Sequence, residues 1–228
     1  MLPKLDDFTV TTSWTNSEKS VVHLLESPRG EKVILKAYRR GFTTSMFRAY
    51  VASSYVARRL PLVPRVLGFQ PWRNELYFSY ISGQRVLEWV LQRFGGNLRL
   101  ADFQSCHGLN PPDHVDPRIA EAFSRFRESV SPEPQRLKKA IRTSYSSLHR
   151  VGILHGSPDP RNIIYDGTRV FIIDFGHARP CLNPAAFDCH GLRYWYGIRR
   201  PREAAVAVAD AARPRTADDR SLHARRIR

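Results

Sequence analysis

The sequence predicts an α+β fold, with strands gathered in the first part of the chain and helices in the second. Short apolar runs separated by turn residues fill the first 84 residues, as in the run from Val33 to Tyr38. Beyond this point the apolar residues recur every three or four positions, which is the spacing of one helix face. Strands followed by helices are the pattern of an α+β protein.

The first part is predicted to contain five strands and one helix. In chain order these are two strands within Phe8–Glu26, a strand at Lys32–Tyr38, a helix at Ser45–Leu60, and strands at Val66–Phe69 and Glu75–Ile81. The residues between the first two strands, Trp14 to Glu18, are predicted to form a polar hairpin turn. In the third strand, a period of two places Ile34 and Lys36 on one face. The helix has a candidate buried face made of Phe47, Val51, Ser54, Tyr55 and Val56, with Arg48, Arg58 and Arg59 left to solvent.

The second part is predicted to be mainly helical. Its elements are a helix at Val86–Phe94 ended by Gly95-Gly96, a polar loop over 97–115, a helix with Asp116 as N-cap and Pro117 at its first position, a long helix marked by Leu137, Ile141, Tyr145 and Leu148, and a last helix within Asp188–Ile198. The helix after Asp116 has an apolar face formed by Ile119, Phe123, Phe126 and Val130, and it is broken by Pro132 and Pro134. From Arg199 onward the chain is rich in Ala and Arg and has no aromatic residue, so we expect a frayed helix that runs into disorder.

Residues 154–178 carry the clearest chemical signal in the chain. Two apolar runs, Ile163–Tyr165 and Val170–Ile173, flank an Asp166-Gly167 turn and predict a β-hairpin. A hairpin of this length returns Asn162 and Asp174 to the same end. Both side chains offer the hard oxygen atoms that Mg²⁺ prefers, so they form the predicted metal site.

These residues also carry a family resemblance. His155-Gly156, Asn162 and Asp174-Phe175-Gly176, in this order, resemble the catalytic and metal-binding loops of the protein-kinase-like superfamily. The form is the short His-Gly-Asp one of small atypical kinases, such as the RIO kinases, the Kdo kinases and the aminoglycoside phosphotransferases. The resemblance implies a bilobal protein-kinase-like fold with a short carboxy-terminal lobe, because few residues follow Asp174. It also implies ATP and Mg²⁺ as cofactors.

A second part of the resemblance lies near the amino terminus. Lys36 stands in a strand similar to the third strand of a kinase amino-terminal lobe, where a lysine neutralises the α- and β-phosphates of the nucleotide. The acidic residue that usually pairs with this lysine is missing, because the helix Ser45–Leu60 has none. Lys36 is therefore expected to find another counter-ion or to stay unpaired until nucleotide binds. A glycine-rich phosphate loop is also missing, since residues 11–20 contain no glycine.

The acceptor side of the motif is altered. Where the family has its catalytic Asp, this chain has Ser157, whose hydroxyl cannot take a proton as a carboxylate does. Asp159, bracketed by Pro158 and Pro160, is the candidate replacement that would orient the acceptor. In the alternative, Asp159 only accepts backbone hydrogen bonds in a proline-bracketed turn. Arg161 either adds positive charge near the transferred group or is a solvated loop residue.

The resemblance implies three segments. Residues 1–84 would form a β-rich nucleotide-binding lobe, residues 85–198 a mainly helical lobe with the catalytic and metal loops, and residues 199–228 a basic tail. Ser82–Arg85 would be the hinge between the lobes, where an adenine ring lies against backbone groups in the family.

Composition bears on partners and compartment. Lys and Arg number 36 against 21 Asp and Glu, a formal net charge of +15, which favours anionic partners such as nucleotide, RNA, phosphorylated glycolipid or an acidic protein. A genomic bias toward Arg codons would produce the same excess. Three cysteines, Cys106, Cys181 and Cys189, make no closed disulfide framework and favour a reducing compartment. With no secretory signal and no apolar run that spans a bilayer, we expect a cytoplasmic protein without a transmembrane segment.

Two functional hypotheses follow. The first is an ATP-dependent phosphotransferase of unknown acceptor and weak activity, using Lys36 for phosphates, Asn162 and Asp174 for Mg²⁺, and Asp159 or Ser157 at the acceptor. The second is a catalytically inactive pseudokinase that acts as a binding or regulatory module.

Overall fold

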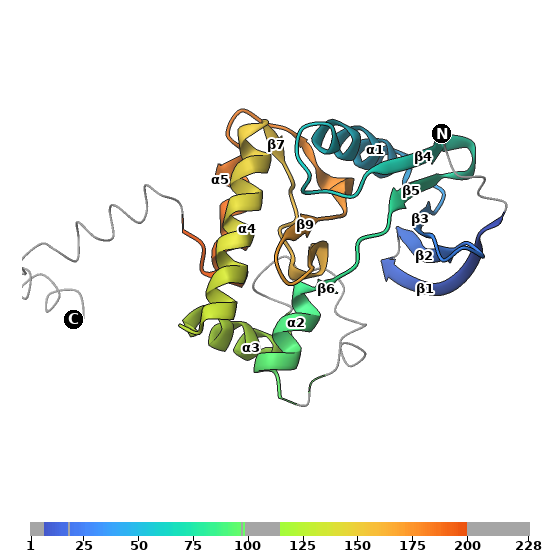
Figure 1. Ribbon diagram of the computed structural model, residues 1–228. Coiled ribbons are helices and arrows are strands. Elements are labelled where there is room, and N and C mark those ends of the chain that lie inside the picture. Colours follow the sequence, from blue (N-terminus) through green and yellow to red (C-terminus); the bar gives the residue numbers. More distant parts are fainter. Residues whose placement is uncertain (1–6, 18, 97, 99–114, 200–228) are drawn as a thin grey trace, which may run out of the picture. The chain divides into compact units, whose positions relative to one another are not determined.

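The computed structural model describes residues 7–17, 19–96, 98 and 115–199, and these residues form an α+β protein (Figure 1). The described residues up to Ile198 belong to one compact unit. The predicted polar loop, apart from Leu98 and Val115, and the predicted tail beyond Arg199 lie outside the described residues, and so does Cys106. No helix in the described ranges combines the length and the apolar character needed to cross a membrane.

The first part of the chain forms a five-stranded antiparallel sheet with the order β1-β2-β3-β5-β4. Its strands are β1 (Thr9–Ser17), β2 (Ser20–Glu26), β3 (Lys32–Tyr38), β4 (Val66–Gln70) and β5 (Glu75–Ser79). All five predicted strands are confirmed. The central strand is β3, in which Lys36 is paired with Val22 on one side and Leu76 on the other. A lysine in such a position is held by hydrogen bonds on both edges of its strand and has little backbone freedom.

The predicted helix after β3 is confirmed as α1 (Thr43–Ala57), but most of its predicted buried face is wrong. Its buried residues are Met46, Ala49, Ala52, Ser53 and Val56. Of the predicted large side chains, Phe47 is 45% and Val51 61% exposed. The helix contacts both the sheet and the turn after Asp174, and such a close approach on two sides favours small side chains over large ones.

Among the described residues, the second part contains four helices, α2 (Val86–Phe94), α3 (Pro117–Glu128), α4 (Pro132–Arg150) and α5 (Pro184–Tyr196). Asp116 caps α3 as predicted, because its side chain accepts a hydrogen bond from the backbone N–H of Arg118. Val130 was wrongly assigned to the buried face; α3 ends before it, and its side chain is 87% exposed. Pro132 begins α4 rather than only ending α3, since proline suits the first turn of a helix. One apolar core joins the four helices to the hairpin that follows α4.

Short strands connect this helical part to the chemical motif. The predicted hairpin is confirmed as β8 (Ile163–Tyr165) and β9 (Val170–Ile172), and β6 (Gln84–Arg85) adds a third strand beside β8. A second pair, β7 (Ile153–Leu154) and β10 (Arg179–Pro180), brackets the motif at its two ends. The part of the chain that the structure describes also contains single turns of 3₁₀ helix at η2 (Pro71–Arg73), η4 (Pro160–Asn162) and η5 (Phe175–His177).

Candidate active site

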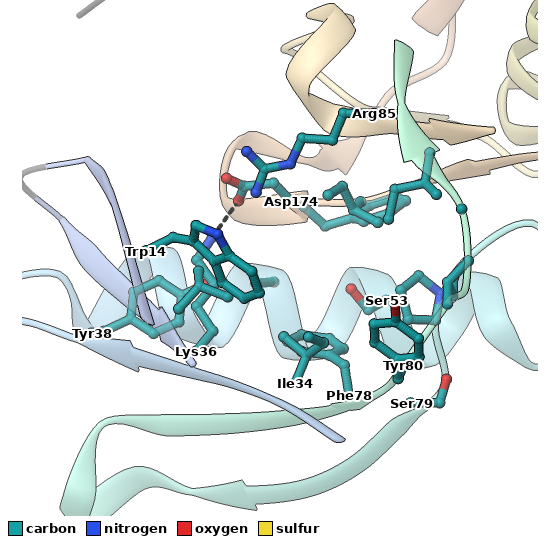
Figure 2. Close-up of a pocket in the computed structure, with 18 of the residues that line it drawn as sticks. Trp14, Ile34, Lys36, Tyr38, Ser53, Phe78, Ser79, Tyr80, Arg85 and Asp174 are labelled. Atoms are coloured by element: carbon teal, nitrogen blue, oxygen red, sulfur yellow. Dashed lines mark hydrogen bonds and ion pairs between the residues drawn. The ribbon is translucent and has the colours of Figure 1, made fainter. Parts of the chain in front are cut away.

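A cavity of about 270 Å³ lies between the sheet, α1 and the β6–β8–β9 strands (Figure 2). Its floor and roof are apolar and come from four strands and the segment after β9; they include Val22, Ile34, Phe78, Ile164 and Ile173. One side is the segment from Ser79 to Arg85, which contains the predicted hinge. Lys36 and Asp174 also line the cavity, together with Arg85 and Glu88, and Figure 2 shows Lys36 and Asp174 lying away from Ser79 and Tyr80. The cavity therefore has an apolar body and a charged end.

The charged end is built by an ion pair. The Nζ atom of Lys36 donates to Oδ1 of Asp174 at 2.6 Å, although the two residues are 138 positions apart in the chain. Burial opposes both charges, but each group stabilises the other. As a result the pKa of Lys36 is raised above its ordinary value, and the pKa of Asp174 is lowered to about 2. Both residues are thus charged at neutral pH.

This ion pair identifies the counter-ion of Lys36, which the sequence left open because the helix after its strand contains no acidic residue. No acidic residue occurs in α1, and Lys36 takes Asp174 as its counter-ion instead. The first of the two expectations for Lys36 is therefore the one that the structure adopts.

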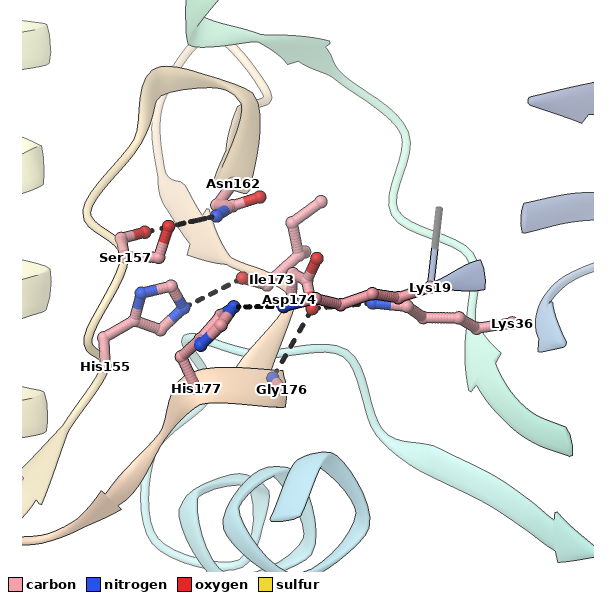
Figure 3. A network of polar contacts seen from close by, with 9 residues as sticks. All are labelled: Lys19, Lys36, His155, Ser157, Asn162, Ile173, Asp174, Gly176 and His177. Atoms are coloured by element: carbon pink, nitrogen blue, oxygen red, sulfur yellow. Dashed lines mark hydrogen bonds and ion pairs between the residues drawn. The ribbon is translucent and has the colours of Figure 1, made fainter. Parts of the chain in front are cut away.

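The backbone of Asp174 has a conformation that few residues tolerate. Its φ is 62° and its ψ is 67°, in the left-handed region, and its carboxylate accepts from the backbone N–H of Gly176. Asp and Asn visit this region more readily than other non-glycine residues, because their short polar side chains bond to nearby backbone groups. The turn directs the carboxylate toward Lys36 (Figure 3).

The hairpin brings Asn162 to the same end as Asp174, as its length predicted. Ile163 pairs with Ile172, and one step further the N–H of Ile173 donates to the carbonyl oxygen of Asn162 at 2.9 Å. The side-chain Nδ2 of Asn162 donates to the backbone oxygen and to Oγ of Ser157, both at 3.2 Å. This fixes the amide so that its oxygen points away from Ser157 (Figure 3).

The two oxygen-bearing side chains suit Mg²⁺. The described residues contain no group of three or more His, Cys, Asp and Glu side chains that could hold a metal by themselves. Mg²⁺ does not need such a cage, since it is commonly held by one or two protein oxygens together with water and substrate phosphates. An ionised carboxylate and an oriented amide oxygen fit this requirement.

Asp159 is placed differently from a free catalytic carboxylate. It is buried, and its oxygens accept from the backbone N–H, Nε and NH2 of Arg161 at 2.8, 3.0 and 2.9 Å. One of these donors is a backbone N–H, as in the alternative of a proline-bracketed turn, whereas the other two belong to the guanidinium group of Arg161 and form an ion pair. Oγ of Ser157 accepts a hydrogen bond from Nδ2 of Asn162, so Ser157 lies beside one of the two candidate metal ligands.

Sequence reasoning missed Asp188. This residue lies on α5, is fully buried, and accepts hydrogen bonds from the backbone N–H groups of His155 and Gly156 at 3.1 and 2.9 Å. Nε2 of His149 donates to the same carboxylate at 2.9 Å. The ring of His155 continues the chain of contacts, because its Nε2 donates to the carbonyl oxygen of Ile173 at 3.0 Å. A lone Asp within a predicted helix carried no signal of this role.

The turn between β1 and β2 differs from its prediction. Strand β1 runs on to Ser17, Trp14 pairs with Val22, and the indole of Trp14 lines the cavity. Lys19, just after the turn, donates through Nζ to Nε2 of His177 at 3.3 Å (Figure 3). The turn and the segment after Asp174 therefore meet at the charged end of the cavity.

Neither the known protein-family models nor the curated proteins contain a match to this sequence.

Proposed function

We propose that the protein is an ATP-dependent phosphotransferase of weak activity, with a bilobal protein-kinase-like fold. The observation that carries this proposal is the 2.6 Å ion pair of Lys36 and Asp174 at the charged end of an apolar cavity. Phosphoryl transfer needs positioned cations and a dry, shaped site more than it needs covalent chemistry from the protein. The pair, the cavity and Asn162 together provide these features.

Each part of the nucleotide has a matching part of the site. The cavity is near the lower limit of small-molecule sites, about 300 Å³, and its apolar walls suit a flat heteroaromatic ring. Ile34 and Ile173 would lie against the ring, and the segment from Ser79 to Gly83 would face its edge. Lys36 would neutralise the phosphates. Mg²⁺, which supplies charge neutralisation at the transferred group, would be held by Asn162 and Asp174.

We expect weak activity because the residues that would orient and deprotonate the phosphate acceptor are altered. Ser157 cannot act as a base at neutral pH, and Asp159 already has three hydrogen bonds from Arg161. Loss of a general base lowers the rate by about 10²–10⁴-fold, and the contributions of substrate positioning and charge neutralisation remain. The net charge of +15 suits an anionic acceptor.

The Asp159–Arg161 contacts also favour a second candidate, a pseudokinase that binds nucleotide and transfers nothing. The two candidates share the nucleotide site and differ only in turnover. A measurement of binding and a measurement of hydrolysis therefore separate them.

The first experiment compares the thermal unfolding of the protein with and without Mg-ATP. We expect a rise in the unfolding temperature that needs both Mg²⁺ and ATP and that is lost in Asp174→Asn. Asn tolerates the left-handed backbone at this position, so the variant removes the charge without adding strain. No rise at saturating Mg-ATP would contradict both candidates.

The second experiment measures ATP hydrolysis by the wild type and by Ser157→Asp. A slow wild-type rate that increases at least tenfold in the variant supports the phosphotransferase. Binding of Mg-ATP without hydrolysis in either protein supports the pseudokinase.

A further inference from the structure

Two tyrosines in the described residues have buried hydroxyl groups that donate no hydrogen bond to any of those residues: Tyr38 and Tyr145. They are 6% and 1% exposed. Buried hydroxyl groups are normally paired, so each of these needs an explanation. Their surroundings differ, because Tyr38 lines the cavity and Tyr145 lies in the core of α4, away from it.

Tyr38 lies directly beside the ion pair. It is two positions after Lys36 in β3, so both side chains leave the same face of the strand. Nζ of Lys36 is 5.1 Å from the centre of the Tyr38 ring (Figure 2). The ring itself packs with Met46, Ala49 and Leu76, which holds it in place. The hydroxyl of Tyr38 is therefore held, buried, beside the charged end of the cavity that its side chain helps to line.

This hydroxyl keeps its proton. Burial raises the pKa of Tyr38. The positive charge of Lys36 and a hydrogen bond from its ammonium group to the phenol oxygen oppose this effect without reversing it, and the negative charge of Asp174 adds to it. At neutral pH the phenol is a hydrogen-bond donor. An anionic oxygen that enters beside Lys36 would find a second donor there.

The sequence of the connection between β1 and β2 indicates why a side-chain donor is needed at this position. Residues Ser17 to Ser20 contain no glycine, so the turn lacks the residues that let successive backbone N–H groups approach a phosphate closely. Side-chain donors have to supply what the backbone does not. Lys36 and Tyr38 are two such donors on one rigid strand.

We propose that Tyr38 is a ligand-binding residue, whose hydroxyl donates a hydrogen bond to an oxygen of the phosphate chain held by Lys36. The proposal rests on the nucleotide site proposed above and adds to it a phosphate contact made by a phenol. Tyr38 would then discriminate phosphorylated ligands from unphosphorylated ones.

The test uses Tyr38→Phe, with Tyr145→Phe as the matched control. Each variant removes one buried hydroxyl that donates no hydrogen bond and keeps the ring, so the fold is expected to persist, with an unfolding temperature without ligand close to that of the wild type. Calorimetric titrations then measure the affinity of each protein for Mg-ATP and for adenosine, which has no phosphate. We expect Tyr38→Phe to bind Mg-ATP about tenfold more weakly and adenosine equally well, since a single hydrogen bond to a charged group has about this effect. Tyr145→Phe should match the wild type with both ligands.

Three outcomes would overturn the proposal. Equal affinity of Tyr38→Phe and wild type for Mg-ATP means that the hydroxyl touches no phosphate. An equal loss for Mg-ATP and adenosine means that the variant changes the cavity shape instead. A wild-type protein that does not bind Mg-ATP removes the proposed function and this contact with it, and that result is distinguishable because it appears before any variant is compared.

Discussion

The buried carboxylate of Asp188 accepts a 2.9 Å hydrogen bond from the backbone N–H of Gly156. The bond joins α5, near the end of the described chain, to the loop that contains Ser157 and Asn162. Because Asp188 also accepts from His149 and from the N–H of His155, one fully buried side chain fixes the start of the loop. The position of the candidate metal ligands depends on a residue that touches neither the cavity nor the metal end of the loop.

Replacing Asp188 with Asn should destabilise the protein by about 2–4 kcal/mol, because an amide offers one acceptor oxygen and directs its NH2 group at a donor. Chemical unfolding measures the effect. Asp116→Asn is the control: Asp116 is an N-cap, where Asn and Asp are equivalent, and its other partner is the exposed guanidinium of Arg118, so the free energy of unfolding should change by less than about 1 kcal/mol. Equal effects of the two variants would contradict the role of Asp188.

The Lys36–Asp174 pair should behave as a coupled unit. Lys36→Met leaves a carboxylate with its main partner removed, and Asp174→Asn leaves a buried ammonium group, so each change should cost about 2–4 kcal/mol. The double variant should cost less than the sum of the two, because it leaves no charge unpaired. A double-mutant cycle of unfolding free energies gives this coupling directly, and strict additivity would show that the pair contributes no coupling.

The turn between β8 and β9, which contains Asp166, should make the free energy of unfolding depend on pH in the acidic range. Burial opposes ionisation of Asp166, but hydrogen bonds from the N–H groups of Arg169 and Thr168 outweigh it and lower the pKa of Asp166 to about 2. A carboxylate with a lowered folded-state pKa stabilises the fold above its unfolded-state pKa, about 3.9, and this contribution is lost as the pH falls toward 2. Asp166→Ala should therefore lose about 1 kcal/mol at pH 7, with the difference from wild type shrinking below pH 4.

The measurement is urea unfolding between pH 2.5 and 7 for the two proteins. Glu31→Ala, which removes an exposed carboxylate at the turn before β3, is the control and should follow the wild type across this range. A difference for Asp166→Ala that stays constant down to pH 2.5 would show that its carboxylate charge is not what stabilises the turn.

Gly191 should be required for the contact between α5 and the loop of Ser157. A Cβ atom at this position would lie 2.5 Å from Cγ of Pro158, whose ring is closed onto the backbone and can give way only by a change of pucker. Glycine to alanine inside a helix ordinarily stabilises by about 1 kcal/mol, but here the overlap should reverse the sign and cost about 1–3 kcal/mol. Thermal unfolding of Gly191→Ala decides between the two, and a stabilised variant would contradict the close packing of Pro158 on α5.

Local patterns were sufficient for the elements and for part of the site. The hairpin was predictable because an Asp-Gly turn and two apolar runs are local signals, and its length alone returns Asn162 to Asp174. The cap at Asp116 and the core stripe of α4 were predictable for the same reason. The buried face of α1 was not, because hydrophobicity favoured Phe47 and Val51, whereas the space available beside η5 favoured Ala49 and Ala52.

By itself, then, the sequence determined the α+β order of strands and helices and the hairpin, since these depend on neighbours within a few positions. It proposed Lys36, Asn162 and Asp174 as candidate residues through the resemblance of their motifs. Only the tertiary structure decided that Lys36 pairs with Asp174 across 138 positions, that Asp159 is held by Arg161, and that Asp188 fixes the loop from α5. It also decided that the hydroxyl of Tyr38 is buried beside the charge pair. These contacts join elements distant in the chain or depend on which groups share a closed space, and neither property is visible in local residue patterns.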